Sequence, residues 1–290
     1  MAPAGTLTPA AAAAILARVR EARPLIHHIT NTVTQNDVAN ATLAIGAAPV
    51  MAHAPEEVED MVAQAQALVL NIGTLTAAVV EAMLRAARRA NTAGIPVVLD
   101  PVGAGATPFR TAQAERLLAG ARIACVRGNA GEIAALAGQS GTVRGVDAAG
   151  AAGPRPAAAD AEAALAAALA VRLGCAVAAT AAVDVLTDGA RLVRLAHGHP
   201  LLRAITGAGC MATACIGACA AVEADPLAAA VAGLACFEIA AERAAALAAG
   251  PGSFRVALLD ALAALSPADV AARGAWRAET VTPAGAAGRA

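Results

Sequence analysis

The chain has 290 residues, a length typical of one large α/β domain or two smaller ones, and a formal net charge of −1. This charge excludes the strong positive field by which proteins bind nucleic acids or acidic membranes. The absence of lysine excludes a Walker A phosphate-binding loop and Schiff-base chemistry. Because 58% of the residues are hydrophobic but only 1% are aromatic, the core must be built from Leu, Val, Ile and Ala.

Two apolar segments bear on secretion and membrane insertion. No basic residue precedes the apolar run of "MAPAGTLTPAAAAAILARVREARP", which argues against a signal peptide. Residues 204–222 carry no charge and are long enough to span a bilayer, but they contain Thr206-Gly207-Ala208-Gly209 and lack an aromatic belt. We therefore expect a buried helix and no membrane contact. The six cysteines form no CxxC pair, so we expect reduced thiols in a cytoplasmic protein.

The first quarter of the chain predicts helices alternating with strands. A first helix ends near Arg23, and a short strand follows in "LIHHITN". Asn36-Asp37 is predicted to cap a helix that ends at Gly46. A second strand in "APVMAH" precedes Pro55, which with two glutamates predicts the start of another helix.

The rest of the chain continues this alternation. The clearest helix, "AAVVEAMLRAARRANTAG", has Gly94 as its expected C-cap. Short aliphatic runs bounded by turn signals lie in "ALVLNIG", "IPVVLDPVGAG", "ARIACVRGNAGEIAAL", "CAVAATAAVDVLTD" and "ARLVRLAHG". This pattern predicts an α/β fold with a largely parallel central sheet flanked by helices. We expect one domain over residues 1–290, with a loop at 138–156 and a flexible tail over about 276–290.

Polar residues collect where the predicted strands end. In open α/β sheets, ligands bind outside the carboxyl ends of the strands, so this edge is the predicted site. The residues concerned are Asn71, Asp100, Arg127, Asn129, Glu132, Thr180 and Asp184.

Two of these positions allow both a functional and a structural interpretation. Asp100, in "VVLDPVGAGATPF", is placed either to bind Mg²⁺ beside phosphates or to cap the next turn. Its loop is no dinucleotide fingerprint, because Pro108 stands where the third glycine belongs. In "VRGNAGEIAAL", Arg127 is suited to a polyphosphate, while Glu132 either serves a metal or forms a capping box with Asn129.

The stretch "ITGAGC" places two glycines and Cys210 at the start of a predicted helix. Unsatisfied backbone N–H groups at a helix N-terminus attract anions, and glycines let a phosphate approach the main chain. The same positive potential is expected to lower the pKa of the Cys210 thiol. A buried core cysteine, a nucleophile and a metal ligand are the alternatives. Zinc is not indicated, because no histidine falls at a recognised ligand spacing from the cysteines.

The ordered motifs together resemble the hydroxyethylthiazole kinase family, which belongs to the ribokinase-like fold group. The resemblance extends from near Pro24 to near Asp260, through the segments "PLIHHITN", "APVMAHAPEEVEDM", "LVLNIGTL", "VVLDPVGAGATPFRT", "RGNAGEIAAL", "VDVLTD", "ITGAGC" and "GPGSFRVALLD". It implies a kinase that transfers the γ-phosphate of ATP to the hydroxyl of 4-methyl-5-(2-hydroxyethyl)thiazole in thiamine biosynthesis.

The resemblance also implies roles for individual residues. Substrate-binding positions match Asn31, Met51 and Gly207, and ATP-binding positions match Arg127 and Thr180. The acidic pair around Mg²⁺ matches Asp100 and Glu132. Cys210 stands where most ribokinase-like enzymes carry an aspartate base, and it is the expected catalytic residue.

Assembly is implied as well, and one motif departs from the family pattern. The family forms homotrimers with sites at subunit interfaces. Where it usually reads Thr-Gly-Glu-Val-Asp, this chain has Ala181-Ala182 between Thr180 and Val183-Asp184. The lost carboxylate affects the local nucleotide or metal contacts.

Three other functions are compatible with the sequence. One is a ribokinase-like kinase for another small alcohol, such as a hydroxymethylpyrimidine. Another is a hydrolase with Cys210 as its nucleophile and His197 or His199 as its base. The third is an oligomeric relative without catalytic activity.

Overall fold

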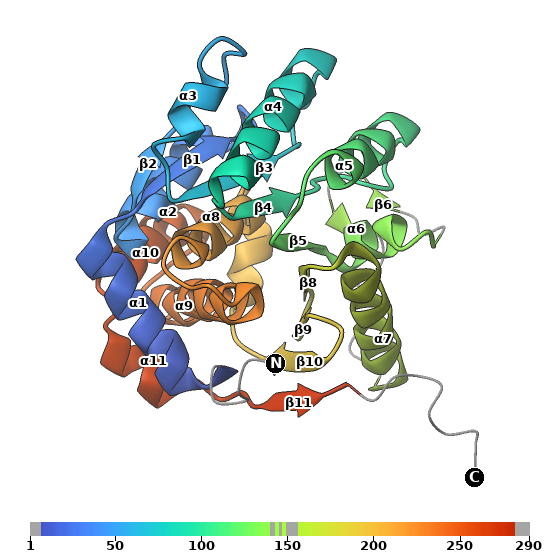
Figure 1. The fold of residues 1–290 in the computed structure, drawn as a ribbon. Coiled ribbons are helices and arrows are strands. Elements are labelled where there is room, and N and C mark those ends of the chain that lie inside the picture. The colour runs from blue at the N-terminus through green and yellow to red at the C-terminus, as the bar shows by residue number, and fades with distance from the viewer. Residues whose placement is uncertain (1–6, 140–142, 145–146, 149–155, 282–290) are drawn as a thin grey trace.

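The computed structural model describes residues 7–139, 143–144, 147–148 and 156–281. Its main feature is a nine-stranded sheet of strand order β11-β10-β9-β8-β5-β4-β3-β1-β2, which curves through the molecule in Figure 1. The strands are β1 (Leu25–Ile29), β2 (Ala48–Val50), β3 (Ala67–Asn71), β4 (Val97–Asp100), β5 (Cys125–Asn129), β8 (Ala176–Thr180), β9 (Asp184–Thr187), β10 (Arg191–Leu195) and β11 (Ala278–Thr280). The short β6 (Val143–Arg144) and β7 (Asp147–Ala148) form a separate antiparallel pair.

The predicted parallel character of the sheet is confirmed for its larger part. From β2 to β8 every neighbouring pair is parallel, whereas β9, β10 and β11 continue the sheet in antiparallel pairs. In the parallel part, β3 and β4 are continuous aliphatic runs up to their last residue because helices cover both faces. Their carboxyl ends therefore form one common edge, which carries the predicted polar residues.

Helices cover the two faces of the sheet as separate layers (Figure 1). One layer comprises α1 (Pro9–Ala22), α2 (Gln35–Ile45), α8 (Ala208–Ala220), α9 (Pro226–Ala245), α10 (Pro251–Ala263) and α11 (Pro267–Arg273). The other comprises α3 (Val58–Val62), α4 (Ala77–Ala93), α5 (Pro108–Gly120), α6 (Ala130–Leu136) and α7 (Pro156–Leu173). Each layer encloses its own aliphatic core, in which alanine lets helices and sheet approach closely. The buried α8 and α9 lie at the centre of the first core.

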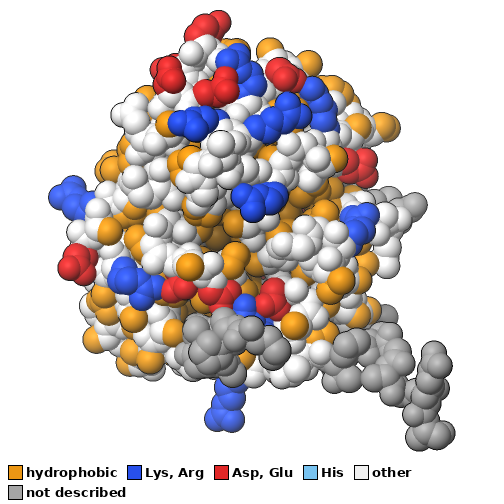
Figure 2. All heavy atoms as spheres, viewed as in Figure 1, with side chains coloured by type: hydrophobic (Ala, Val, Ile, Leu, Met, Phe, Trp, Pro, Cys, Tyr) orange, Lys and Arg blue, Asp and Glu red, His pale blue; other side chains and the backbone are white. Residues whose placement is uncertain are grey.

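On the face shown in Figure 2, charged residues of both signs gather at the end formed by α3 and α4, and others lie on the lower part of the face. Ion pairs join these helices: Arg85 of α4 pairs with Glu59 of α3, and Arg116 of α5 pairs with Glu81 of α4. In the described part of the chain, no helix has the length and apolarity needed to cross a membrane. The charge-free stretch from residue 204 instead contains α8, nearly all of which is buried.

Two predictions about the elements need correction. The second helix begins at Gln35 after the N-cap residue Thr34, and the predicted cap residue Asp37 is buried and paired with Arg255. Residues 276–281 are no flexible tail: the indole of Trp276 is 5% exposed and donates to the carbonyl of Leu7, and β11 pairs with β10. The predicted loop at 138–156 and the tail beyond residue 281 lie largely or wholly outside the described residues.

Candidate active site

The predicted polar residues meet at the carboxyl edge of the sheet because their strands are neighbours. Asn71 and Asp100 end β3 and β4 and lie directly opposite each other in register. Asn129 and Thr180 end β5 and β8 and are opposite in the same way. The strand order thus brings together positions separated by more than a hundred residues in the chain.

A chain of side-chain hydrogen bonds links this edge to Cys210. Asn31 Nδ2 donates to Asn71 Oδ1 at 2.9 Å, and Asn71 Nδ2 donates to Asp100 Oδ2 at 3.0 Å. The same two amides contact the Cys210 sulfur, Asn71 at 3.2 Å and Asn31 at 3.4 Å. Cys210 is therefore one side chain away from the buried Asp100, as required if both act on one ligand.

Cys210 lies in the first turn of α8, whose start depends on a glycine. The helix begins at Ala208, and its N-cap Gly207 has a φ of +81°, a conformation that glycine adopts without strain. A Cβ at Gly207 would also lie 2.6 Å from Thr34 Cγ2. The close packing of Thr34 and Gly207 joins the loop after β1 to the start of α8.

The expected lowering of the Cys210 pKa is wrong. Burial raises the pKa of the thiol, and the negative charge of Asp100 raises it further, although hydrogen bonds with Thr34 and Asn71 act in the opposite direction. The loss of water around the sulfur outweighs the positive potential of the helix N-terminus. The thiol is accordingly protonated at neutral pH.

Arg127 reaches from β5 across the start of α8. Its Nη2 donates to Thr180 Oγ1 at 2.7 Å, and its Nη1 lies 3.9 Å from Asp100 Oδ2. A Cβ at Gly209 would lie 2.3 Å from Arg127 Nη1, so the guanidinium rests directly on the backbone of the helix start. This places a fixed positive charge beside the first N–H groups of α8.

Asp100 is fully buried, and its two carboxylate oxygens differ. Oδ2 accepts hydrogen bonds from Asn71 and, at 2.8 Å, from Thr213 Oγ1. Oδ1 is buried and has no hydrogen-bond partner among the described residues. Burial raises the pKa of this carboxyl, opposed mainly by the charge of Arg127. Asp100 does not simply cap the next turn, because its bonds go to side chains of β3 and α8.

Glu132 forms the predicted capping box with Asn129 and also holds the loop after β4. Asn129 N donates to Glu132 Oε2 at 2.8 Å, and Glu132 N donates to Asn129 Oδ1 at 2.9 Å. Its other oxygen, Oε1, accepts from Gly103 N at 2.7 Å. Burial, together with the nearby charge of Asp100, raises the pKa of Glu132 to about 7. Both carboxylate oxygens are thus engaged by backbone N–H groups.

The loop between β8 and β9, where the family pattern is broken, is held by a buried acidic pair. Asp184 Oδ1 accepts from Ala181 N at 2.8 Å, and the Asp184 carboxyl is hydrogen-bonded to Glu238 of α9. Burial raises the pKa of both groups, and the charge of Asp184 raises that of Glu238 further. Asp184 thus holds the backbone of the residue that follows Thr180.

Met51 lies in a shallow hollow of about 420 Å³ beside this network, together with Thr32, Gln35, Asn36 and Ala39. The hollow begins one residue after Asn31. Contacts between neighbouring residues therefore join most of the predicted site residues, while Met51 lines the hollow that begins next to Asn31. The joined residues are Asn31, Gly207, Cys210, Asp100, Arg127, Thr180 and Glu132.

Some site residues were not predicted. Thr213, one turn after Cys210, binds Asp100, and Thr34 donates from its backbone N–H and its hydroxyl to Asn31 Oδ1, each at 3.0 Å. Helical spacing from Cys210 is the sequence signal for Thr213. Asn71 was noted only as a polar strand end, yet it is the residue that joins Cys210 to Asp100.

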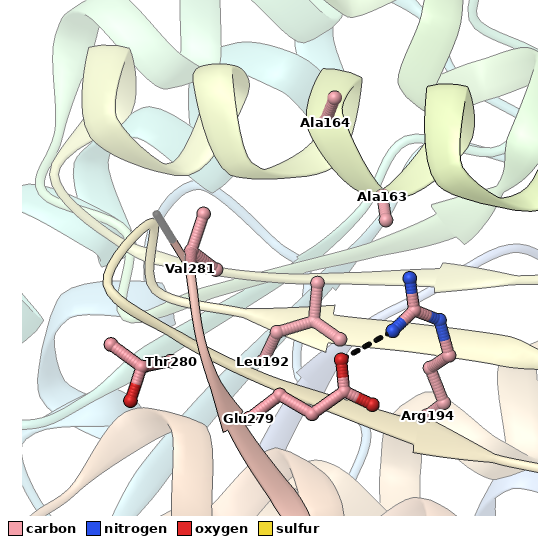
Figure 3. A pocket seen from close by; sticks show the side chains of 7 residues that line it. All are labelled: Ala163, Ala164, Leu192, Arg194, Glu279, Thr280 and Val281. Atoms are coloured by element: carbon pink, nitrogen blue, oxygen red, sulfur yellow. Dashed lines mark hydrogen bonds and ion pairs between the residues drawn. The ribbon is translucent and has the colours of Figure 1, made fainter. Parts of the chain in front are cut away.

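Another hollow, of about 190 Å³, lies between α7 and the β10–β11 edge (Figure 3). Arg194 points into it and forms ion pairs with Glu279 of β11 and Asp160 of α7. Its charged groups already satisfy one another, and none of the predicted site residues lines it. Among the described residues, no group of three or more His, Cys, Asp and Glu side chains is arranged to hold a metal ion by itself.

Comparison with known proteins agrees with the resemblance. The model of the hydroxyethylthiazole kinase family matches residues 16–268. The hydroxyethylthiazole kinase of Methanoculleus marisnigri is 56% identical over 260 residues, which cover 89% of this chain and 90% of that protein.

Solved structures agree as well. The structure of the hydroxyethylthiazole kinase protein of Pyrococcus horikoshii OT3 is 42% identical in sequence, with a TM-score of 0.83. The match covers 93% of this chain and 99% of the Pyrococcus chain. A ribokinase-like superfamily protein of Enterococcus faecalis V583, 11% identical with a TM-score of 0.56, matches over 84% and 87% of the two chains and shares the fold. The chain therefore belongs to the hydroxyethylthiazole kinase family and has a ribokinase-like fold.

Proposed function

We propose that this chain transfers the γ-phosphate of ATP to the hydroxyl group of 4-methyl-5-(2-hydroxyethyl)thiazole, a step of thiamine biosynthesis or salvage. One observation carries the proposal: the first turn of α8 brings Cys210 and the Arg127 guanidinium together with Asp100, which Asn71 links to the thiol. Membership of the hydroxyethylthiazole kinase family indicates the acceptor alcohol.

The start of α8 is suited to a phosphoryl group in transfer. The first N–H groups of a helix have no partner within it and point outward, so they attract negative charge. Arg127 adds a planar guanidinium, which packs against the backbone of Gly209. Phosphoryl transfer depends on positioning and charge stabilisation more than on covalent chemistry. We infer that Arg127 and Thr180 contact ATP at this point.

The donor set fits one Mg²⁺ ion at Asp100. Its Oδ1 is buried and has no hydrogen-bond partner among the described residues, and carboxylate oxygens are preferred ligands of Mg²⁺. Glu132 places a second carboxyl nearby, although both of its oxygens already accept backbone N–H bonds. When bound with ATP, Mg²⁺ neutralises charge on the phosphates. Asp100 would hold the ion, and Glu132 would adjust the local charge and fix the Gly103 loop.

The acceptor alcohol is proposed to bind beside Asn31, Met51 and Gly207, with its hydroxyl at Cys210. The Cys210 sulfur accepts bonds from two amides, so its S–H, which has Thr34 within hydrogen-bond reach, is the donor that it can offer to a ligand. Because burial keeps the thiol protonated, we infer that Cys210 orients the hydroxyl and relays its proton to an oxygen of the transferred phosphoryl group, rather than acting as a preformed thiolate base.

We further propose a homotrimer in the cytoplasm. The hollow beside Met51 is open at the surface of one chain, and the apolar side chains of Val33 and Leu43 are 64% and 56% exposed near it. A neighbouring subunit that covers them would complete the acceptor site. All six cysteines are free, as is usual for proteins of a reducing compartment.

A single incubation tests the proposed reaction. The purified chain is supplied with ATP, Mg²⁺ and the thiazole alcohol, in parallel with a hydroxymethylpyrimidine, and the products are resolved by mass. We expect an ATP-dependent product that is one phosphoryl group heavier than the thiazole alcohol. Exclusive phosphorylation of the pyrimidine would favour the alternative of a hydroxymethylpyrimidine kinase. No product from either alcohol would favour a relative without catalytic activity.

The role of Cys210 is tested by Cys210→Ser. We expect the turnover number to fall about tenfold, the equivalent of one hydrogen bond, because the smaller oxygen is displaced from the two amides. The KM for ATP should stay within twofold, since Arg127 and Thr180 remain in place. An unchanged turnover number would remove Cys210 from the mechanism.

The alternative of a cysteine hydrolase is not supported, because no histidine contact with Cys210 is found in the described part of the chain. His197 Nδ1 is paired with Glu242 at 2.9 Å, and its Nε2 accepts from Ala275 N at 3.3 Å. His199 accepts from Leu201 N at the start of the 3₁₀ helix Pro200–Ala204. The contacts of Cys210 go to Asn31 and Asn71, which cannot act as bases.

A further inference from the structure

Arg110 makes a set of contacts that the proposed mechanism has not used. It lies in the first turn of α5, and its guanidinium donates to three main-chain carbonyl groups on two separate loops. Nη1 donates to the carbonyls of Ile72 at 3.1 Å and Val102 at 2.9 Å, and Nη2 donates to the carbonyl of Gly73 at 2.8 Å.

The two loops that Arg110 joins are those that carry site residues. Ile72 and Gly73 directly follow Asn71, and Val102 lies two residues after Asp100. Gly73 N also donates to Asn71 Oδ1 at 2.9 Å, so the position of this loop decides where the Asn71 amide points. That amide donates to both Asp100 and Cys210.

The loop after β4 is fixed from two sides. Arg110 holds the carbonyl of Val102, while Glu132 accepts from the next N–H group, that of Gly103. The Arg110 stem also packs on this loop, since a Cβ at Gly103 would lie 3.0 Å from Arg110 Cδ. Removal of the guanidinium would free the Val102 carbonyl and leave Glu132, at Gly103, and Thr111, at Gly105, as the side chains that still hold this loop.

We propose that Arg110 is a positioning residue for phosphoryl transfer, which fixes the Asn71 amide relative to Asp100 and Cys210. The inference rests on the proposed kinase function. A planar guanidinium with donors in a fixed fork can bridge three carbonyls at once, whereas the ammonium group of lysine is a single point charge on a flexible stem. Arg110 itself does not touch the reacting groups.

The test compares Arg110→Ala and Arg110→Lys with the control Arg116→Ala. Arg116 lies on the same helix but forms an exposed ion pair with Glu81, away from both loops. For each variant, thermal unfolding is recorded, and kcat and the KM values for ATP and the thiazole alcohol are measured well below the melting temperature. The Arg110→Ala assay is repeated with added guanidinium ion at concentrations that leave wild-type activity unchanged.

We expect kcat of Arg110→Ala to fall about 100-fold, as for a displacement of catalytic groups by about 1 Å. The KM for ATP should stay within twofold, guanidinium should restore part of kcat, and Arg110→Lys should be intermediate. Arg116→Ala should match the wild type.

Two results would overturn the role. One is a kcat of folded Arg110→Lys or Arg110→Ala within twofold of an active wild type. The other is a loss that follows the melting temperature and does not respond to guanidinium. If Arg110→Ala does not fold, the kcat of Arg110→Lys decides. A wild-type chain that phosphorylates no thiazole alcohol would instead overturn the proposed function, and the role of Arg110 with it.

Discussion

The contact between Gly209 and Arg127 leaves no room for a side chain. A Cβ at this position would lie 2.3 Å from Nη1 and 3.0 Å from both Cζ and Nη2 of the guanidinium. Gly209→Ala should therefore displace Arg127 from the start of α8 and break its bond to Thr180. A hydrogen bond to a charged group is worth about 1.5–3 kcal/mol, so we expect the KM for ATP to rise at least about tenfold.

The stability of Gly209→Ala separates this effect from unfolding. Alanine favours a helix over glycine by about 1 kcal/mol, which offsets the cost of moving a partly exposed arginine. The melting temperature should change little while the KM for ATP rises. Gly252→Ala is the matched control, because a Cβ there meets nothing within 4 Å. Equal KM values for Gly209→Ala and the wild type would contradict the contact.

At the scale of residues, the sequence predicted which groups meet but not their ionisation. Polar residues at strand ends and two glycines before Cys210 are local patterns, and the strand order then places them together. The pKa of Cys210 depends instead on the burial of the thiol and on the charge of Asp100, and both come from segments that are distant in the chain. No local pattern reports that loss of water, so the helix N-terminus alone gave the wrong direction.

Among the elements, α8 and α9 make the closest contact with a backbone atom that the described glycines reveal. A Cβ at Gly233 would lie 2.6 Å from both N and Cα of Ile216 and 2.8 Å from the carbonyl carbon of Cys215. These are backbone atoms of a buried helix, which cannot rotate away as a side chain would. Gly233→Ala must push α9 from α8, and overpacking of this kind costs about 1–3 kcal/mol.

Urea unfolding measures this cost as a lower midpoint at an unchanged m value. Gly252→Ala again serves as the control, because it adds the same methyl group to α10 in open space and should be neutral or slightly stabilising. Because α8 also carries Cys210, a shift of this helix should lower kcat at temperatures where Gly233→Ala is still folded. A Gly233→Ala variant as stable as the wild type would show that the two helices are not in backbone contact.

Elements with strong local patterns were predicted, and those defined by distant partners were not. Aliphatic runs and glycine C-caps such as Gly46 and Gly94 were sufficient for most strands and helices. The edge strand β11 has three exposed residues and pairs with a strand more than eighty residues earlier, so it has no periodic signal. Trp276, the sole tryptophan of the chain, was the available sign that the segment is anchored.

At the scale of the whole molecule, the described strands from residue 25 to residue 280 belong to one continuous sheet, apart from the short β6–β7 pair. Two aliphatic cores, one on each face, are shared by helices from both halves of the chain. We therefore propose a single domain for residues 1–290. The parallel order from β2 to β8 aligns the strand ends into one site edge, and the antiparallel β9–β11 end places Asp184 beside Thr180.

The proposed trimer predicts a surface that a partner covers. Asn36, Ala39 and Leu43 share one face of α2, because they are spaced by three, four and seven residues. The first two line the hollow beside Met51, and Leu43 extends its apolar surface into solvent. A subunit seated on this face would bury Leu43 and close the hollow at the same time. Leu43→Glu should therefore disrupt assembly and acceptor binding together.

Sedimentation velocity at micromolar concentration tests this. We expect the wild type to have the mass of three chains and Leu43→Glu that of one. The KM for the thiazole alcohol should rise in the variant, because water replaces the partner over the hollow. Val171→Glu is the control: Val171 is 69% exposed, but on α7, which covers the other face of the sheet. A wild type that sediments as one chain would mean that Leu43 faces solvent and that one subunit holds the whole acceptor site.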